Sequence, residues 1–269
     1  MALQVLVKKS LVMVTVVTLL VTQLHGTVYQ TPSKVLYITS APFGNFLVAP
    51  GMSIQPWDAF ALLEDIDSCS CKVSCWAAIA CVAWSFVTLA DGSSQCRLAN
   101  KGPTDLDVVE RSNATYYFKE SSVPGVYSFK ADRLLYLTPS MLLPYEDAKA
   151  LCARIPGHRL GMYKTVQQLN MLEEYWCLPG NCPAALYMYL EKTSKGVLFG
   201  DGTPLSATEI GGTDVVMNAP DAYTFIFYNK KVDDDYPTAA KSFLCQANPM
   251  EVGWVQDKHK QYLVHEYES

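Results

Sequence analysis

The nine cysteines of this 269-residue chain fall into two groups. Five lie between Cys69 and Cys96 and four between Cys152 and Cys245, and the 55 residues from 97 to 151 contain none. The chain is longer than one average domain of about 100 to 200 residues, and half of its residues are hydrophobic. The pattern therefore predicts two small domains, each with its own disulfide bonds.

The domain boundary is expected near Glu120–Gly125, where Ser, Pro and Gly interrupt regular structure. The predicted organisation is a signal peptide at 1–26, a first domain at 27–120, a linker and first strand at 121–132, a second domain at 133–248, and a polar tail at 249–269.

The N-terminus has the order of a secretory signal peptide. Lys8 and Lys9 precede an apolar run from Leu11 to Val21, and cleavage is expected near Gly26. A membrane anchor is the alternative, but the run is shorter than the roughly 20 apolar residues that span a bilayer. We expect a secreted, extracellular protein with no membrane span, in which disulfide bonds are the default state of cysteine.

Two further features fit an extracellular protein. Asn113-Ala114-Thr115 is a sequon for N-glycosylation. The formal net charge of -5 and the absence of a Lys/Arg cluster argue against a nucleic-acid partner, which requires clustered positive charge.

In the first domain, Ser68 is expected to cap a helix that places Cys71 and Cys75 on one face. Predicted strands lie at Val35–Thr39, Asn45–Val48 and Thr115–Phe118.

The order Cys71-x3-Cys75-x5-Cys81, followed by Trp84-Ser85-Phe86 and Cys96-Arg97-Leu98, resembles a PAN/apple domain over about residues 33 to 118. The resemblance implies a sheet with one helix, pinned by Cys71–Cys96 and Cys75–Cys81 bridges. Cys69 is then unpaired, and we expect it to link two chains into a homodimer. A zinc site at Cys69-x-Cys71-x3-Cys75 is the alternative, but it needs reduced thiolates.

In the second domain, Pro144–Ile155 has an apolar helical stripe that includes Cys152. Thr165 and Gln168 form a capping box for a second helix. Strands are predicted at Leu186–Leu190, Tyr223–Tyr228 and Ser242–Cys245. Helices followed by short strands indicate an α+β fold. Cys177 and Cys182 are expected to pair with each other as a local loop.

Four segments of this domain together resemble a C-type lectin-like domain. They are the helix Tyr145–Cys152, the strand Leu186–Leu190, the turn Phe199-Gly200-Asp201-Gly202-Thr203-Pro204-Leu205 and the strand Phe243–Cys245. The resemblance covers about 115 residues. It implies two helices with antiparallel strands, a Cys152–Cys245 bridge, and noncatalytic recognition of an extracellular ligand.

Sugar-binding members of that family hold Ca²⁺ through side-chain oxygens of a Pro-containing loop and of a Trp-Asn-Asp strand. By resemblance, the strand positions carry Asp233 and Asp234 here, and the loop carries Asp221 with Asn218 nearby. Ala219 offers no ligand, and Pro237 replaces an inner cysteine of the family. A calcium and sugar site formed by these residues is one expectation, and a solvated acidic turn at 233–235 is the alternative.

Aromatic side chains near the same acidic stretch offer a second means of binding, by stacking on a sugar or anchoring a protein. The candidates are Tyr223, Phe225, Phe227, Tyr228 and Tyr236. Their alternation equally fits a strand that buries one face.

An enzyme is not expected. The chain has no Gly-x-Ser-x-Gly, His-Glu-x-x-His or phosphate-loop motif, and His158 is interpreted as a loop residue rather than a base. The predicted function is noncatalytic binding of a glycan or glycoprotein in defence or adhesion, with weak calcium dependence. The alternative is protein–protein adhesion with neither sugar nor calcium.

Overall fold

The structure is a computed structural model that describes residues 35–40, 44–176, 185–212 and 215–248. The predicted signal peptide, the Cys177–Cys182 loop and the C-terminal tail lie outside these residues. We describe the chain in two parts, an N-terminal part (residues 35–122) and a C-terminal part (residues 123–248), each by itself.

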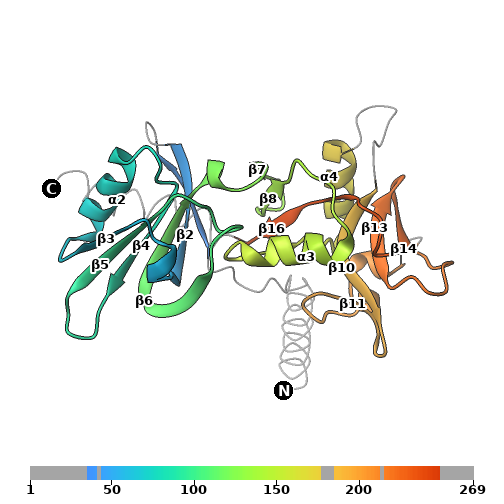
Figure 1. Ribbon diagram of the computed structural model, residues 1–269. Helices are drawn as coiled ribbons and strands as arrows, with labels where there is room; N and C mark the ends of the chain where they lie inside the picture. The colour runs from blue at the N-terminus through green and yellow to red at the C-terminus, as the bar shows by residue number, and fades with distance from the viewer. Residues whose placement is uncertain (1–34, 41–43, 177–184, 213–214, 249–269) are drawn as a thin grey trace, which may run out of the picture. The chain divides into compact units, whose positions relative to one another are not determined.

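The N-terminal part is built on a six-stranded antiparallel sheet in the order β1-β2-β6-β4-β5-β3 (Figure 1). The three strands predicted from the sequence are present, and two of them are longer than expected. The strands are β1 (Leu36–Ser40), β2 (Gly44–Ile54), β3 (Ala61–Glu64), β4 (Ala83–Thr88), β5 (Ser94–Ala99) and β6 (Val108–Lys119). Short 3-10 turns follow β2 at Pro56–Asp58 and β6 at Glu120–Ser122.

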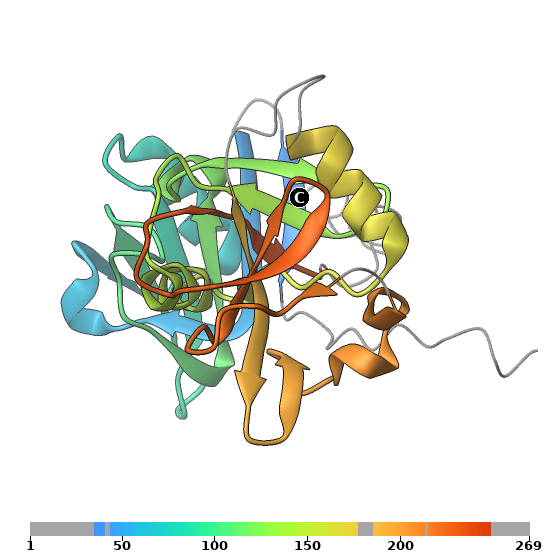
Figure 2. The ribbon, with the colours of Figure 1, turned by 90° about the vertical axis from the view of Figure 1, so that its right-hand side faces the viewer.

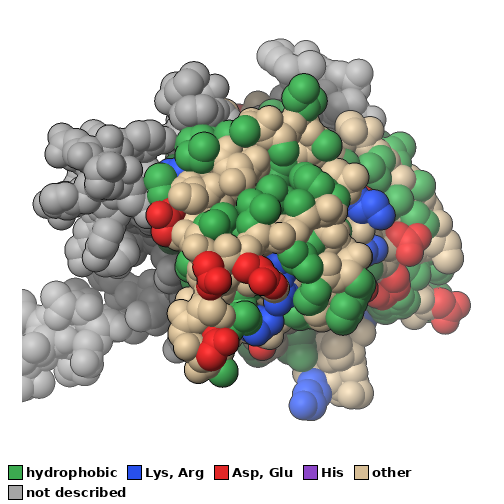
Figure 3. All heavy atoms as spheres, turned by 60° about the vertical axis from the view of Figure 1, so that its left-hand side comes forward, with side chains coloured by type: hydrophobic (Ala, Val, Ile, Leu, Met, Phe, Trp, Pro, Cys, Tyr) green, Lys and Arg blue, Asp and Glu red, His purple; other side chains and the backbone are tan. Residues whose placement is uncertain are grey.

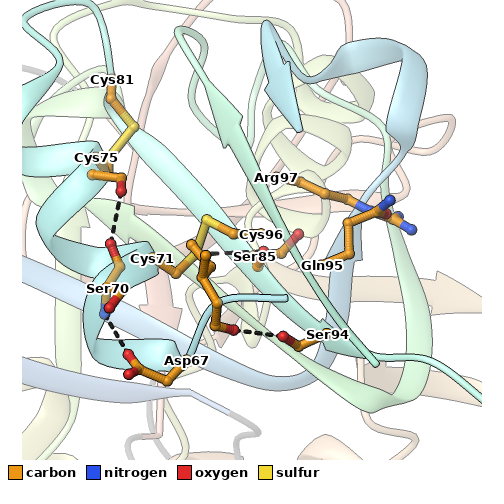
Figure 4. Close-up of a disulfide and its surroundings, with 12 residues drawn as sticks. Asp67, Ser70, Cys71, Cys75, Cys81, Ser85, Ser94, Gln95, Cys96 and Arg97 are labelled. Carbon is orange, nitrogen blue, oxygen red and sulfur yellow. Dashed lines mark hydrogen bonds between the residues drawn. A yellow bond between two sulfur atoms is a disulfide. The ribbon is translucent and has the colours of Figure 1, made fainter. Parts of the chain in front are cut away.

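One helix, α2 (Ser68–Ala77), packs on a face of this sheet and is held by two disulfide bonds (Figure 4). The bonds are Cys71–Cys96 and Cys75–Cys81, the pairs that the PAN/apple resemblance implies. Zinc ligation by Cys71 and Cys75 is therefore wrong, because a cysteine in a disulfide has no thiolate to offer. Among the cysteines that the structure describes, Cys69 is free.

The predicted cap of α2 is wrong by one residue. Asp67 is the N-cap, and its Oδ1 accepts a hydrogen bond from the Ser70 backbone N–H at 2.6 Å, while Ser68 is the first helical residue. A carboxylate at this place also faces the positive end of the helix dipole, which a serine hydroxyl does not exploit.

The described residues of the C-terminal part form two sheets and two α-helices (Figure 2). One sheet has the order β7-β8-β16-β9, and the other has the order β11-β10-β13-β14-β12, with β15 beside β10. The strands are β7 (Val126–Phe129), β8 (Leu135–Thr138), β9 (His158–Leu160), β10 (Leu186–Thr193), β11 (Gly196–Phe199), β12 (Val215–Val216), β13 (Thr224–Tyr228), β14 (Lys231–Asp235), β15 (Ser242–Phe243) and β16 (Cys245–Ala247).

The expectation of antiparallel strands needs a correction in this part. β15 pairs with β10 in parallel, and β12 pairs with β14 in parallel. These contacts are each two residue pairs long. Loop geometry, which the sequence pattern does not encode, sets their direction.

The two predicted helices are α3 (Tyr145–Arg154) and α4 (Val166–Trp176). The capping box of α4 is present, since Thr165 Oγ1 accepts from the Gln168 N–H at 3.1 Å and Gln168 Oε1 accepts from the Thr165 N–H at 3.3 Å. Cys152 on α3 forms a disulfide with Cys245 on β16, 93 positions away. This bond ties the first helix to the last strand.

His158 is not a loop residue, as the sequence indicated, but the first residue of β9, and it is buried. Its Nε2 lies 3.0 Å from the Tyr127 hydroxyl and its Nδ1 lies 2.9 Å from the Pro156 carbonyl oxygen. A carbonyl only accepts, so Nδ1 carries the proton and Nε2 accepts from the tyrosine. His158 thus has a structural role in the core.

Within the described residues, no helix is long and apolar enough to cross a bilayer.

Candidate functional site

The candidate site lies in the segment between β11 and β14, which starts at the Asp-Gly-Thr-Pro turn. The Phe199 N–H donates to the Thr203 carbonyl at 2.9 Å, and the Gly202 N–H donates to the Phe199 carbonyl at 2.8 Å. Gly202 has a φ of 83°, in the left-handed region that glycine adopts without strain. Lys164 forms an ion pair with Asp201 and donates to Thr203 Oγ1 at 3.0 Å. The turn is therefore part of the scaffold.

Asp234 organises the end of the same segment. Its side chain is fully covered, and it accepts hydrogen bonds from the backbone N–H groups of Asn218 at 3.1 Å and Ala219 at 3.2 Å. The Lys192 ammonium forms an ion pair with Asp234 and also donates to the Ala219 carbonyl at 3.2 Å. One lysine of β10 thus bridges the loop at Ala219 and the strand β14.

These contacts keep Asp234 ionised. Burial raises the pKa of its carboxyl, but the hydrogen bonds from Lys192 and from the backbone of Asn218 and Ala219 outweigh burial, so the pKa lies below its usual value. A charge-assisted hydrogen bond to a buried carboxylate is stronger than a neutral one.

The four residues expected to bind calcium do not converge. Asp233 and Asp234 are consecutive in a regular strand, opposite Ile226 and Phe225, so their side chains point to opposite faces. Asn218 contributes its backbone N–H to Asp234, and Asp221 is exposed. In the described residues, no three His, Cys, Asp or Glu side chains gather where they could hold a metal ion.

The acidic run is not a solvated turn, which was the alternative. Lys231–Asp235 forms strand β14. Asp235 forms an ion pair with Lys241, in which Oδ2 of the aspartate lies 2.7 Å from Nζ of the lysine. The two atoms do not have the geometry of a hydrogen bond. Pro237, which stands at the place of the family's inner cysteine, accepts a hydrogen bond from the Tyr145 N–H at 2.9 Å through its carbonyl.

The five aromatic candidates separate into two groups. Phe225 and Phe227 are buried in the core of β13, whereas Tyr223, Tyr228 and Tyr236 are 36%, 47% and 47% exposed. The alternation of aromatic residues along this segment therefore indicates a buried strand face for the two phenylalanines but not for the tyrosines. Tyr223 precedes the strand, and its hydroxyl donates to Glu146 on α3 at 3.0 Å.

Sequence reasoning missed Lys192. Its role depends on a register irregularity between Met188 and Glu191, where β10 pairs with β13, and nothing in the local sequence predicts that irregularity. A second missed group surrounds Glu191, which accepts from Tyr145 at 2.8 Å and from Lys149 at 2.7 Å. The donors and the acceptor of this group are paired with one another, which is typical of a structural network rather than of a binding site.

No family model matches the chain, and no curated protein matches it in sequence. Solved structures do match. The carbohydrate-recognition domain of the mouse scavenger receptor C-type lectin is 17% identical, with a TM-score of 0.38, and the match covers 47% of this chain and 96% of that one. The C-type lectin CEL-I from Cucumaria echinata is 17% identical, with a TM-score of 0.37, over 46% of this chain and 95% of that one.

A third match is the Kupffer cell C-type lectin receptor Clec4f, 14% identical with a TM-score of 0.37, over 45% of this chain and 82% of that one. These solved structures, to which just under half of the chain is similar, are C-type lectin structures.

Proposed function

We propose that the chain is a noncatalytic extracellular recognition protein whose C-terminal part binds a glycan or glycoprotein without a calcium ion at Asp234. The observation that carries this proposal is the bridge from Lys192 to Asp234 and to the Ala219 carbonyl. The extracellular setting rests on the predicted signal peptide and on the disulfide bonds.

The lysine does for the loop what a cation between the same groups would do. It neutralises the buried carboxylate and binds a backbone oxygen of the loop, so the loop is held to β14 by a charge that belongs to the chain. A calcium ion at the same place would have to displace the ammonium or lie beside it, and like charges a few ångströms apart repel. It would also need six to eight oxygens.

Ligand contact is then expected from exposed tyrosines rather than from a metal ion. Tyr223, Tyr228 and Tyr236 combine a flat apolar ring with a hydroxyl, which suits both a sugar face and a protein surface. In this proposal the segment from Met217 to Tyr223, held by Lys192 and Asp234, presents part of the binding surface.

One observation favours a second candidate function, adhesion to another protein without sugar. Large hydrophobic side chains are exposed in the N-terminal part, and hydrophobic side chains cover much of the face in Figure 3. Exposed apolar groups of this kind are Trp57, Phe60, Leu62, Val73 and Ile79. Such surfaces often mark protein interaction sites.

A glycan array with and without chelator separates these functions. We expect binding that is equal in both conditions and that falls in Tyr223→Ala, with Tyr223→Phe, which keeps the ring, as the matched control. Binding that needs calcium and disappears in Asp234→Ala would show that the calcium expectation is right and our proposal wrong. Silence in both conditions favours the protein ligand.

A melting experiment tests the lysine directly. Because Lys192 already neutralises Asp234, millimolar calcium should leave the Tm of the wild-type protein unchanged. An increase of Tm that grows with free calcium and is absent in Asp234→Asn would contradict the proposal.

A further inference from the structure

The glycosylation sequon of the sequence lies in a strand. Asn113-Ala114-Thr115 is the only Asn-x-Ser/Thr triplet in the full sequence, and the structure places it in β6. The residue pairs between β6 and β4 end at Ala114, and those between β6 and β2 pass from Thr115 to Glu110 through a register shift. Asn113 therefore lies where the regular pairing of β6 is interrupted.

The alternation of β6 turns Asn113 away from the buried face of the strand. Ala114 and Tyr116 are buried, whereas Asn113 is exposed. Tyr117, an even number of residues from Asn113, packs against the hydrophobic cluster that contains Cys71 of α2. Since residues two apart in a strand share a face, Asn113 lies on the face of the sheet that carries α2.

Two hydrogen bonds orient the amide group of Asn113. Its Oδ1 accepts from Arg111 Nε at 3.2 Å, and its Nδ2 donates to the carbonyl oxygen of Thr88, the last residue of β4. An amide nitrogen of this kind carries two hydrogens, and the bond to Thr88 needs one of them. A nitrogen that carries a sugar in place of the other hydrogen is still a donor.

An aromatic side chain lies on the same face, diagonally across from Asn113. Phe86 of β4 is paired with Thr115, two residues from Asn113. Diagonal neighbours in an antiparallel pair are about 7 to 8 Å apart, which is within reach of a large group. Phe86 is partly buried against the cluster that contains Trp84, so part of its ring is exposed. A sugar bonded to Asn113 could cover that part by stacking.

We propose that Asn113 carries an N-linked glycan and that its first N-acetylglucosamine lies over Phe86. The sugar comes from a polyprenyl-diphosphate-linked oligosaccharide. Asn113 Nδ2 bonds to C1 of the sugar, the bond from C1 to the diphosphate oxygen breaks, the diphosphate leaves as an anion, and the displaced amide proton passes to solvent. The proposal rests on the extracellular setting of the proposed function, because this transfer accompanies export, but not on the ligand of the C-terminal part.

Translation of the full-length chain in the presence of rough microsomes tests the modification. Protection from added protease identifies the translocated chain, and a loss of apparent mass after treatment with peptide N-glycosidase F identifies the glycan. We expect this mass loss in the wild-type chain and its absence in Asn113→Gln and in Thr115→Ala. Asn170→Gln, at an exposed asparagine of α4 outside any sequon, is the matched control and should keep it.

Each result of this experiment decides a different point. A protected wild-type chain that loses no mass would overturn the proposal. A wild-type chain that is not protected would overturn the extracellular setting, and this proposal with it. The transfer takes place on the chain before it folds, so the comparison does not depend on whether a variant folds.

Thermal melting tests the contact with Phe86. Protein secreted with high-mannose glycans is trimmed by endoglycosidase H, which leaves one N-acetylglucosamine, or by peptide N-glycosidase F, which leaves none and converts the linked asparagine to aspartate. The difference in Tm between the two products is measured in the wild-type protein and in Phe86→Leu, so that the effect of the aspartate cancels. We expect the single sugar to raise the Tm of the wild-type protein and Phe86→Leu to lose most of this difference. No difference in the wild-type protein, or equal differences in both proteins, would refute the contact.

Discussion

His158 should make the protein sensitive to mild acid. The buried imidazole donates from Nδ1 to Pro156 and accepts at Nε2 from Tyr127, so a second ring proton would break the present bond and the hydroxyl would have to turn to accept from it. The pKa of His158 lies at about 4 instead of 6.5, because burial and, to a smaller extent, the charge of Arg159 lower it more than the hydrogen bond to Pro156 raises it. The neutral ring is therefore part of the native structure.

The direction follows from proton linkage. Between pH 6.5 and 4 the unfolded chain binds a proton at His158 that the folded chain excludes, so the free energy of unfolding falls as pH falls. The contribution is fully present above pH 6.5. A difference of 2.5 in pKa (6.5 − 4) corresponds to about 3.4 kcal/mol, of which about 2.6 kcal/mol is lost between neutral pH and pH 4.5.

Urea unfolding at pH 7 and at pH 4.5 measures this loss in the wild-type protein and in His158→Gln. Carboxylates titrate in both proteins, so their contribution cancels in the comparison. We expect the wild-type protein to lose about 2 to 3 kcal/mol more than the variant. Losses that agree to within about 0.5 kcal/mol would refute a neutral buried His158.

Replacing Cys152 and Cys245 together by alanine should lower the free energy of unfolding by about 4 to 5 kcal/mol, because their bond closes a loop of more than ninety residues; a loss below about 1 kcal/mol in urea unfolding would contradict the loop-entropy account. Thr165→Ala should cost about 1 kcal/mol through the lost cap of α4, whereas Thr165→Ser should not, and equal Tm values of the two variants would show that the cap is irrelevant. Lys230 has a φ of 67°, so Lys230→Gly should be about 1 kcal/mol more stable than Lys230→Ala, both variants having lost the ion pair to Glu173; the reverse order would exclude strain at this turn.

The sequence predicted the elements that depend on local chemistry. The capping box at Thr165 gives the start of α4, and the apolar stripe that includes Cys152 gives α3. The bridge partners followed from the spacing of cysteines in the two resembled families rather than from any physical derivation. The order and spacing of the cysteines can be read from the sequence alone.

The candidate site was less predictable, because it depends on which faces of neighbouring strands meet. Counting along the chain located Asp233 and Asp234 but did not show that a regular strand separates their side chains. Lys192 reaches Asp234 because β10 changes register before it. Arg97 lay in the quoted cysteine motif, yet the sequence did not show that its guanidinium group donates to Gln95 and to the Ile54 carbonyl.

The end of the C-terminal part has one more consequence. Ser242–Phe243 pairs with β10 in one sheet, Cys245–Ala247 lies between β8 and β9 in the other, and a single buried residue, Leu244, joins them. A segment this short cannot leave one sheet and keep its place in the other. Backbone amides of β8 and β10 should therefore exchange hydrogen with the solvent in one cooperative opening, so that the two sheets have a common stability.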